Sequence, residues 1–234
     1  TLDELHNPFI MLGMSEGVNL LTEAIASQAK IMIYGDYDVD GTTSVSLVYG
    51  FLKTHCSNII TYIPDRYSEG YGISDQGVKT AIDEGVELFI SLDCGIRAGN
   101  TIEELRQANI NVIVCDHHLP GKQLPNATIL NPKQPNCPYP FKELCGVGVG
   151  FKLLQGFCEQ HSIDNNTLFQ FLDLVAIGTS ADIVSVTGEN RVLVRAGIDI
   201  INKSPRPGVK ALINESKFEG QLTVSNIVFT IGPR

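Results

Sequence analysis

The most constraining feature of the sequence is a regular alternation of short apolar runs and helical patterns between residues 30 and 130. Runs rich in apolar and β-branched residues predict five strands, at 30–34, 59–63, 88–92, 112–115 and 128–130. Helical periodicity lies between them, at 42–53, 74–84 and 100–108. Strands that alternate with helices build βαβ units, so this part of the chain predicts a doubly wound, mainly parallel sheet of the α/β class.

Helical patterns flank this alternating region on both sides. An amphipathic pattern at 15–29 predicts a helix before the first strand, and further helices are predicted at 147–159, 167–181, 190–202, 207–214 and 224–230. With 43% apolar and 18% charged residues, the composition is that of a chain that buries a core. We expect residues 1–234 to form one α/β domain whose C-terminal portion is helical.

Composition also excludes several classes of protein. No stretch approaches about 18 consecutive apolar residues, and the first residues, TLDELHNPF, lack the basic-then-apolar plan of a signal peptide, so nothing indicates a membrane or export. The six cysteines form no C-x-x-C pair, which favours a reducing cytoplasm. The net charge of −9 argues against a protein that coats nucleic acid, although bound divalent cations would weaken that objection.

Residues that can bind metal follow three of the predicted strands. In an open parallel sheet, ligands bind at the carboxyl ends of the strands, so these residues are expected to lie close together. Carboxylates crowded at one edge would repel one another unless cations separated them, and the sequence therefore predicts a metal site. The residues are Asp36, Asp38 and Asp40 after the first strand, Asp93 after the third, and Asp116, His117 and His118 after the fourth.

The stretch GDYDVDGTT also resembles the start of an EF-hand calcium loop. The glutamate that such a loop requires at its twelfth position is replaced by Leu47, and a strand rather than a helix precedes the stretch. An acidic turn without metal is the other alternative. Carboxylates with one or two imidazoles suit Mn²⁺ or Mg²⁺, and this many anionic ligands predict two ions about 3.5–4 Å apart.

These residues carry a resemblance to a known superfamily. Asp38–Gly41, Asp93-Cys94-Gly95, the triplet from Asp116 to His118, and Asp182 within AIGTSADIV resemble the four motifs of DHH phosphoesterases. Four further stretches, IPDRYSEGYGIS, CGVGVGFKL, ENRVLVRAGI and FTIGPR, resemble the RecJ family of exonucleases within that superfamily. The resemblance covers the chain from about residue 14 onward, and it implies a catalytic core that lacks the DHH-associated C-terminal domain.

The resemblance also implies roles for individual residues. Asp38 and Asp93 would bind one ion, while Asp40, Asp93, His117 and Asp182 would bind the other. Many superfamily members carry a histidine where this chain has Tyr34, so Asp36 or water would fill that position. Asp116 would orient a neighbouring imidazole. His118 would face the scissile phosphate and stabilise its developing charge.

The function implied is a metal-dependent single-stranded DNA 5′→3′ exonuclease with two Mn²⁺ or Mg²⁺ ions, active in DNA repair and recombination. Single-stranded DNA would be the substrate, with single-strand-binding protein and a RecQ-type helicase as partners. One alternative keeps the site and changes the substrate to cyclic dinucleotides or short oligonucleotides. Another is a non-catalytic replication scaffold of the same fold, which the retained acids and histidines disfavour.

Three other features allow two interpretations each. Arg66 is predicted to bind a substrate phosphate, or else to pair with Asp65 or Glu69. The glycines at 146, 148 and 150 suggest close helix packing rather than a dinucleotide site, because their spacing is not that of G-x-G-x-x-G. The hydroxyl residues at 42–44 are predicted to cap the helix that follows the acidic stretch.

Overall fold

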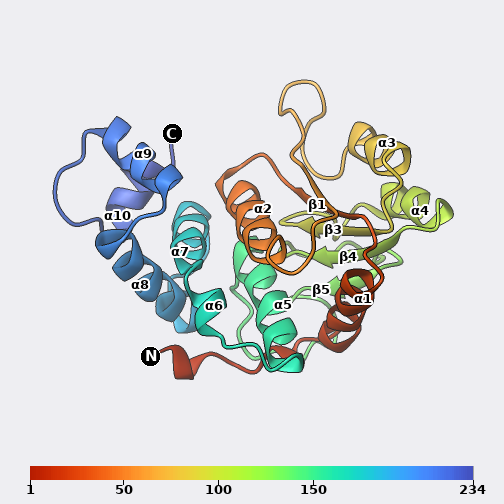
Figure 1. Ribbon diagram of the computed structural model, residues 1–234, viewed down its shortest axis with the longest axis horizontal. Helices are drawn as coiled ribbons and strands as arrows, with labels where there is room; N and C mark the ends of the chain where they lie inside the picture. Colours follow the sequence, from red (N-terminus) through yellow and green to blue (C-terminus); the bar gives the residue numbers. More distant parts are fainter. Residues whose placement is uncertain (234) are drawn as a thin grey trace.

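A computed structural model describes residues 1–233 of the chain, and a five-stranded parallel sheet lies at its centre (Figure 1). The spatial order of the strands is β2-β1-β3-β4-β5, and every neighbouring pair is parallel. The predicted α/β fold is confirmed, and each predicted strand is correct to within one residue at either end. The strands are β1 (Ile31–Gly35), β2 (Ile59–Tyr62), β3 (Leu88–Leu92), β4 (Asn111–Cys115) and β5 (Thr128–Leu130).

Helices cover both faces of the sheet, so the central strands are apolar on both sides. Along β1, Ile31 and Ile33 belong to one hydrophobic cluster, with residues of α1 (Met14–Ala26), α2 (Val39–Leu52) and α5 (Gly146–Gln160). Met32 and Tyr34 point to the other face and join a second cluster, with residues of α3 (Asp75–Asp83) and α4 (Gly99–Gln107). This alternation follows from the two-residue period of a strand.

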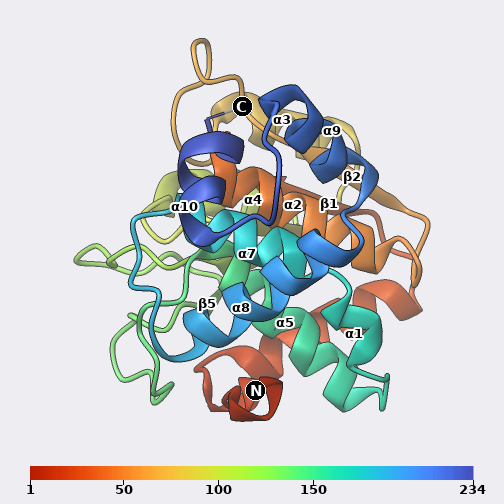
Figure 2. The same ribbon diagram turned by 90° about the vertical axis from the view of Figure 1, so that its left-hand side faces the viewer.

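The C-terminal part is helical, as predicted, and packs beside α2 (Figure 2). α7 lies between α2 and α8, and a third hydrophobic cluster joins α7 to the last helices. Arg234, the last residue of the FTIGPR stretch, lies outside the described residues. The helices are α6 (Asn166–Phe169), α7 (Leu172–Ala181), α8 (Gly188–Lys203), α9 (Pro207–Ser216) and α10 (Val224–Asn226), followed by the π-helix η3 (Ile227–Ile231).

The single helix predicted at 167–181 is wrong, because the chain breaks between α6 and α7. Phe171 stands at the break with a non-helical backbone (φ −98°, ψ 4°). Its ring packs where α2 has a glycine: a Cβ on Gly50 would lie 2.7 Å from Phe171 Cε1. The guanidinium of Arg206 covers the same ring at 5.1 Å. The break therefore allows the ring of Phe171 to pack against α2. A continuous helix would direct this ring elsewhere.

The start of α2 also differs from the prediction. Helix α2 begins at Val39, and its N-cap is Asp38, whose Oδ1 accepts a hydrogen bond of 2.9 Å from the Gly41 amide. Thr42, Thr43 and Ser44 are not caps. Each of their hydroxyls donates to the carbonyl four residues earlier, at 2.7 Å. The helix therefore begins three residues before the predicted start at 42, and Asp38 rather than residues 42–44 caps it.

Two short 3₁₀ helices, η1 (Leu2–Glu4) and η2 (Pro8–Ile10), precede α1. Among the helices of residues 1–233, none on its own combines the length and the apolar character needed to cross a membrane. The segments Leu2–Ile10 and Met14–Ala26 meet both criteria only when joined, and they are bent by 85° relative to each other.

Candidate metal centre

The acidic stretch after β1 turns sharply into α2, and the turn separates its three carboxylates. Gly41 makes the turn possible, because a Cβ at this position would lie 2.3 Å from the carbonyl oxygen of Asp36. Asp36 and Asp40 are buried, whereas Asp38 caps the helix and is exposed. The alternate spacing of the three acids therefore does not place them on one side of the chain.

Asp40 is held by the first turn of α5, a contact that sequence analysis missed. Its Oδ2 accepts a hydrogen bond of 2.6 Å from the Gly146 amide, and its Oδ1 accepts one of 2.8 Å from the Val147 amide. Amides at a helix N-terminus favour a negative charge. The only sequence signal was the glycine-rich stretch itself, which was interpreted as close packing.

That packing prediction is confirmed. A Cβ on Gly146 would lie 2.5 Å from Asp93 Cβ, and one on Gly150 would lie 3.2 Å from Leu92 Cδ2. The first turn of α5 can thus approach the end of β3 only because glycine stands at position 146. The same turn contacts both Asp40 and Asp93, and so it brings the two carboxylates together.

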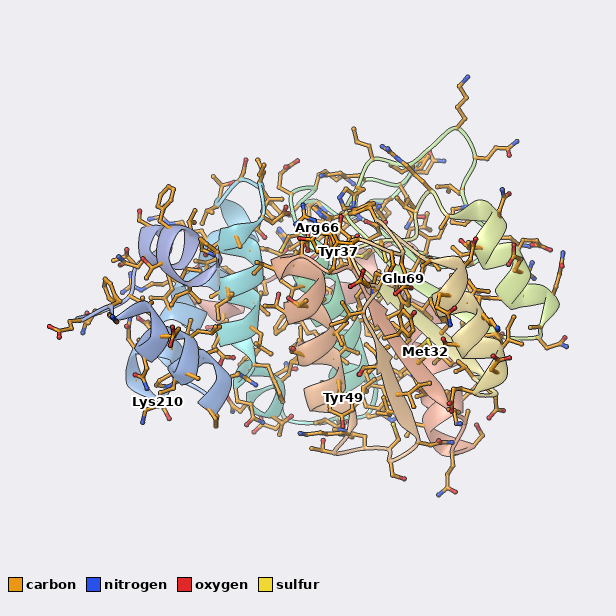
Figure 3. The ribbon with its side chains drawn as sticks, turned by 90° about the horizontal axis from the view of Figure 1, so that it is seen from above. Met32, Tyr37, Tyr49, Arg66, Glu69 and Lys210 are labelled. Carbon is orange, nitrogen blue, oxygen red and sulfur yellow. The ribbon has the colours of Figure 1, made fainter. Side chains whose placement is uncertain are left out.

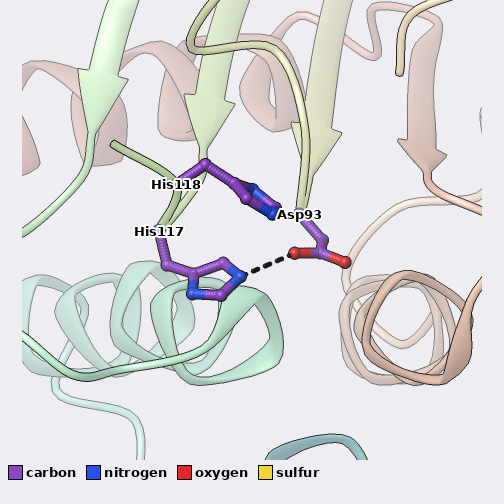
Figure 4. A group of neighbouring side chains, drawn as sticks. All are labelled: Asp93, His117 and His118. Carbon is purple, nitrogen blue, oxygen red and sulfur yellow. Dashed lines mark ion pairs between the residues drawn. The ribbon is translucent and has the colours of Figure 1, made fainter. Parts of the chain in front are cut away.

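Asp93 follows β3 directly and has a backbone conformation that only some residues adopt easily. Its φ is +62°, in the left-handed region, where a non-glycine residue stores about 1–3 kcal/mol of strain. Its side chain is buried, and its Oδ1 lies 3.1 Å from Nε2 of His117 without the geometry of a hydrogen bond (Figure 4). Such strain is frequent at functional sites.

His117 Nε2 faces three carboxylates at once. It lies 3.1 Å from Asp93 Oδ1, 3.6 Å from Asp182 Oδ2 and 3.8 Å from Asp40 Oδ2. Among the described residues, Asp93 Oδ1, Asp182 Oδ2 and His117 Nδ1 are buried atoms without a hydrogen-bond partner. Buried polar atoms are normally paired, so these orphaned donors and acceptors fit a site built for a cation.

Two groups of side chains could each hold a metal ion. Asp40, His117 and Asp182 form the first group, and Asp93, His117 and His118 form the second; within each, the ligand atoms lie within 4.8 Å of one another. The four residues predicted around the second ion are thus brought together. Asp38 belongs to neither group, and its role as a ligand stays a prediction.

The electrostatics of the centre favour a bound cation. Burial, together with the carboxylate of Asp182, raises the pKa of Asp40 to about 7. Burial and the carboxylate of Asp40 raise the pKa of Asp93 well above its ordinary value, and burial lowers the pKa of His117. A divalent cation would stabilise the deprotonated form of all three side chains.

Asp116 follows β4 and fixes the orientation of His118. Its Oδ1 accepts hydrogen bonds from the amides of His117 (2.7 Å) and His118 (3.0 Å) and lies 2.8 Å from His118 Nδ1, while its Oδ2 accepts one from the Ile96 amide (2.9 Å). Burial acts to raise the pKa of Asp116, but these hydrogen bonds hold it below its ordinary value. The hydrogen bond to Asp116 raises the pKa of His118. This geometry agrees with the orienting role predicted for Asp116.

Asp36 lies beside the centre but in neither metal group. Its Oδ1 accepts a hydrogen bond of 2.7 Å from the Tyr37 amide, and its Oδ2 has no partner within residues 1–233. Burial raises its pKa. Tyr34, which stands where the family resemblance predicts a histidine, points to the other face, where its hydroxyl donates to the Gly72 carbonyl at 2.8 Å. Tyr34 therefore does not face the metal groups.

Arg66 is exposed and lies beside Tyr37, the residue that follows Asp36 (Figure 3). Its guanidinium covers the ring of Tyr37 at 5.2 Å from the centroid. Asp65 instead accepts a hydrogen bond of 2.8 Å from the hydroxyl of Ser68, and Glu69 accepts one of 2.8 Å from the Asp65 amide. Neither ion pair considered for Arg66 forms within residues 1–233, so its charge is available to an anion.

A doubly wound sheet with acids and adjacent histidines at its carboxyl edge is the arrangement expected of a DHH phosphoesterase. Residues 30–179 match the family model described as "DHH family, N-terminal domain". The chain therefore belongs to the DHH family.

Its similarities to individual proteins point to one branch of that family. It is 40% identical to the single-stranded-DNA-specific exonuclease RecJ of Bacillus subtilis (strain 168) and 39% identical to that of Escherichia coli (strain K12). The alignments cover 99% and 95% of this chain, but only 29% and 41% of those two proteins. A crystal structure of exonuclease RecJ bound to manganese superposes with a TM-score of 0.86 at 32% identity, over 95% of this chain and 56% of the other.

Proposed function

We propose that residues 1–234 form the DHH catalytic domain of a RecJ-type exonuclease, which hydrolyses single-stranded DNA from its 5′ end in DNA repair and recombination. The observation that carries the proposal is the convergence of Asp40, Asp93 and Asp182 on one imidazole nitrogen of His117. The similarity to single-stranded-DNA-specific RecJ exonucleases supports the substrate. The 5′→3′ polarity is implied by the resemblance to the RecJ family alone. Oxygen ligands with one or two imidazoles support Mn²⁺ or Mg²⁺ as the two cations.

The chain's own residues hold and position the reacting groups. Asp40, Asp93, His117 and Asp182 would hold one cation, and Asp38 and Asp93 the other, with Asp36 as an additional acid beside it. When bound, the cations supply Lewis acidity and lower the pKa of a coordinated water. The amides of Gly146 and Val147 fix the carboxylate of Asp40 before any ligand arrives.

His118 and Arg66 act on the phosphate. Asp116 holds the His118 ring through Nδ1 and favours its protonated form, which can donate from Nε2 to a phosphoryl oxygen as negative charge develops. Nε2 of His118 lies 3.1 Å from the Tyr71 hydroxyl. This hydroxyl orients the imidazole until a phosphate replaces it as the partner of Nε2. The guanidinium of Arg66 would bind a phosphate of the strand bidentately.

The test is Mn²⁺-dependent release of mononucleotides from a single-stranded oligonucleotide labelled at its 5′ end. We expect the label to appear first as a mononucleotide, duplex DNA to be a poor substrate, and Asp93→Asn to be inactive. Hydrolysis of cyclic dinucleotides in place of the labelled strand would support the alternative substrate. Activity that persists in Asp93→Asn would contradict the proposed centre.

We further propose that the protein acts in the cytoplasm with single-strand-binding protein and a RecQ-type helicase. The resemblance to the RecJ family supports the partners, and the six free cysteines support a reducing compartment. Co-purification of both partners with the tagged protein from its own cells tests the interactions. Recovery of neither partner would contradict this part of the proposal.

A further inference from the structure

A cavity of about 900 Å³ opens beside the metal centre, on the other side of His118. Three segments line it: residues 71–73, residues 94–101 leading into α4, and residues 123–126, with Asp116 and His118 among its walls. None of its lining residues belongs to α2, α5 or α7, the helices around Asp40. Its volume is within the range of about 300–1,000 Å³ that small-molecule sites occupy.

The charges of the cavity favour an anionic ligand. Both oxygens of Asp116 accept hydrogen bonds from the chain, and Glu103 pairs with Arg106 at 3.5 Å. Arg97 is different, because its Nε donates to the Leu119 carbonyl at 2.8 Å and its terminal nitrogens have no carboxylate partner within residues 1–233. The cavity therefore offers a held guanidinium whose charge is not compensated by the protein.

The neutral groups of the lining are also suited to nucleic acid. Asn100, Gln123 and Asn126 bring three side-chain amides to the cavity, and none of these amides has a hydrogen-bond partner among the described residues. Amide side chains both donate to and accept from base edges, and a guanidinium binds a phosphate or stacks on a base. Ile73, Ile96 and Pro125 add apolar surface for a sugar or a base face.

We propose that this cavity binds the base and sugar of one unpaired nucleotide next to the scissile phosphate. The proposal rests on the proposed function and adds a subsite to it. His118 contributes both to the second metal group and to the cavity wall, so a phosphate bound at His118 has its adjoining nucleoside at the cavity mouth. A base can enter only after it leaves a duplex, which requires unpairing and unstacking. The cavity therefore contributes to selectivity for single strands.

Filling the cavity tests the subsite. Gly99 lines it at the start of α4, and a Cβ there would meet nothing within 4 Å, so Gly99→Leu should fold and project into open space. Arg97→Gln removes the charge with a smaller change of shape. The matched control is Gly208→Leu, near the start of α9. A Cβ on Gly208 also meets nothing within 4 Å, but Gly208 lines a different cavity, of about 350 Å³.

The measurement is the affinity for a fluorescent single-stranded oligonucleotide with hydrolysis-resistant phosphorothioate linkages, in Mn²⁺. We expect Gly99→Leu and Arg97→Gln each to weaken binding about tenfold, equivalent to about 1.4 kcal/mol, while the control binds normally. Calorimetry should show unchanged Mn²⁺ affinity in all three variants. Unchanged oligonucleotide binding by both cavity variants would overturn the proposal.

An abasic strand shows whether a base fills the cavity. Removing the first two bases at the 5′ end should weaken binding to the parent protein, with little further loss in Gly99→Leu, because variant and strand lack the same contact. Additive losses would place the base elsewhere and overturn the proposal. If the parent protein binds these strands but does not hydrolyse ordinary DNA, the proposed function is contradicted. The binding comparison would still show whether a base occupies the cavity.

Discussion

The burial of Asp40 predicts that the metal-free protein loses stability as pH rises. Burial and the Asp182 carboxylate raise the pKa of Asp40 from 3.8 to about 7, so the folded protein keeps a proton that the unfolded chain has already released. The resulting stability is fully present below the unfolded pKa and is lost as pH rises through the folded pKa. Each pKa unit is worth about 1.4 kcal/mol, so the loss is about 4 kcal/mol between about pH 4 and pH 7. The raised pKa of Asp93 acts in the same direction.

Urea unfolding in the presence of a chelator, followed by circular dichroism over this pH range, measures the effect. In Asp40→Asn the titration is absent, so its unfolding free energy should fall by about 4 kcal/mol less than that of the parent over the same range. The amide cannot accept both hydrogen bonds from Gly146 and Val147, and so the slopes rather than the absolute stabilities are compared. Mn²⁺ should stabilise the parent more at about pH 8 than at about pH 5, because its ligands must be deprotonated. Parallel pH profiles for parent and variant would refute the reasoning.

Three substitutions test the centre further. Asp93→Asn keeps a residue that tolerates the left-handed backbone and should nearly abolish Mn²⁺ binding by calorimetry; binding like the parent's would exclude a bridging role. His118→Ala should lower turnover by roughly 10²–10³ while Mn²⁺ stays bound, and loss of the metal would instead make His118 a ligand. In Gly146→Ala the new Cβ would lie 2.5 Å from Asp93 Cβ, so Mn²⁺ affinity should fall. Gly148→Ala is the control, since its Cβ meets the flexible end of Leu144 at 3.3 Å; equal affinities in both variants would contradict the role of Gly146.

The sheet could be predicted from sequence because its strands are short apolar runs with clear polar boundaries. Asp93 and Asp116 follow their strands directly, so strand prediction alone placed both acids at one edge. The break before α7 could not be predicted in this way. The apolar pattern runs through 167–181 without interruption, and the chain breaks because the ring of Phe171 fits against Gly50, a contact between distant parts of the sequence.

The candidate site also has one part that could be predicted from sequence and another that could not. The gathering of His117 with Asp93 follows from strand order, but the positions of Asp38 and Asp40 depend on where α2 begins. With Val39 as its first residue, one acid becomes the exposed cap and the other enters the buried first turn. No local sequence pattern predicts that the amides of Gly146 and Val147 bind Asp40, because only the completed fold brings these residues together.

The hydrogen bonds between Asp40 and the start of α5 also bear on when the centre forms during synthesis. Asp40 and Gly146 are separated by 106 positions along the chain. A contact over so long a loop forms late, because the entropy of closing the loop opposes it until other parts have packed. While the ribosome is still making the segment before Gly146, the carboxylate of Asp40 lacks the two amides that bind it in the folded protein. We therefore expect cation binding to follow the docking of α5.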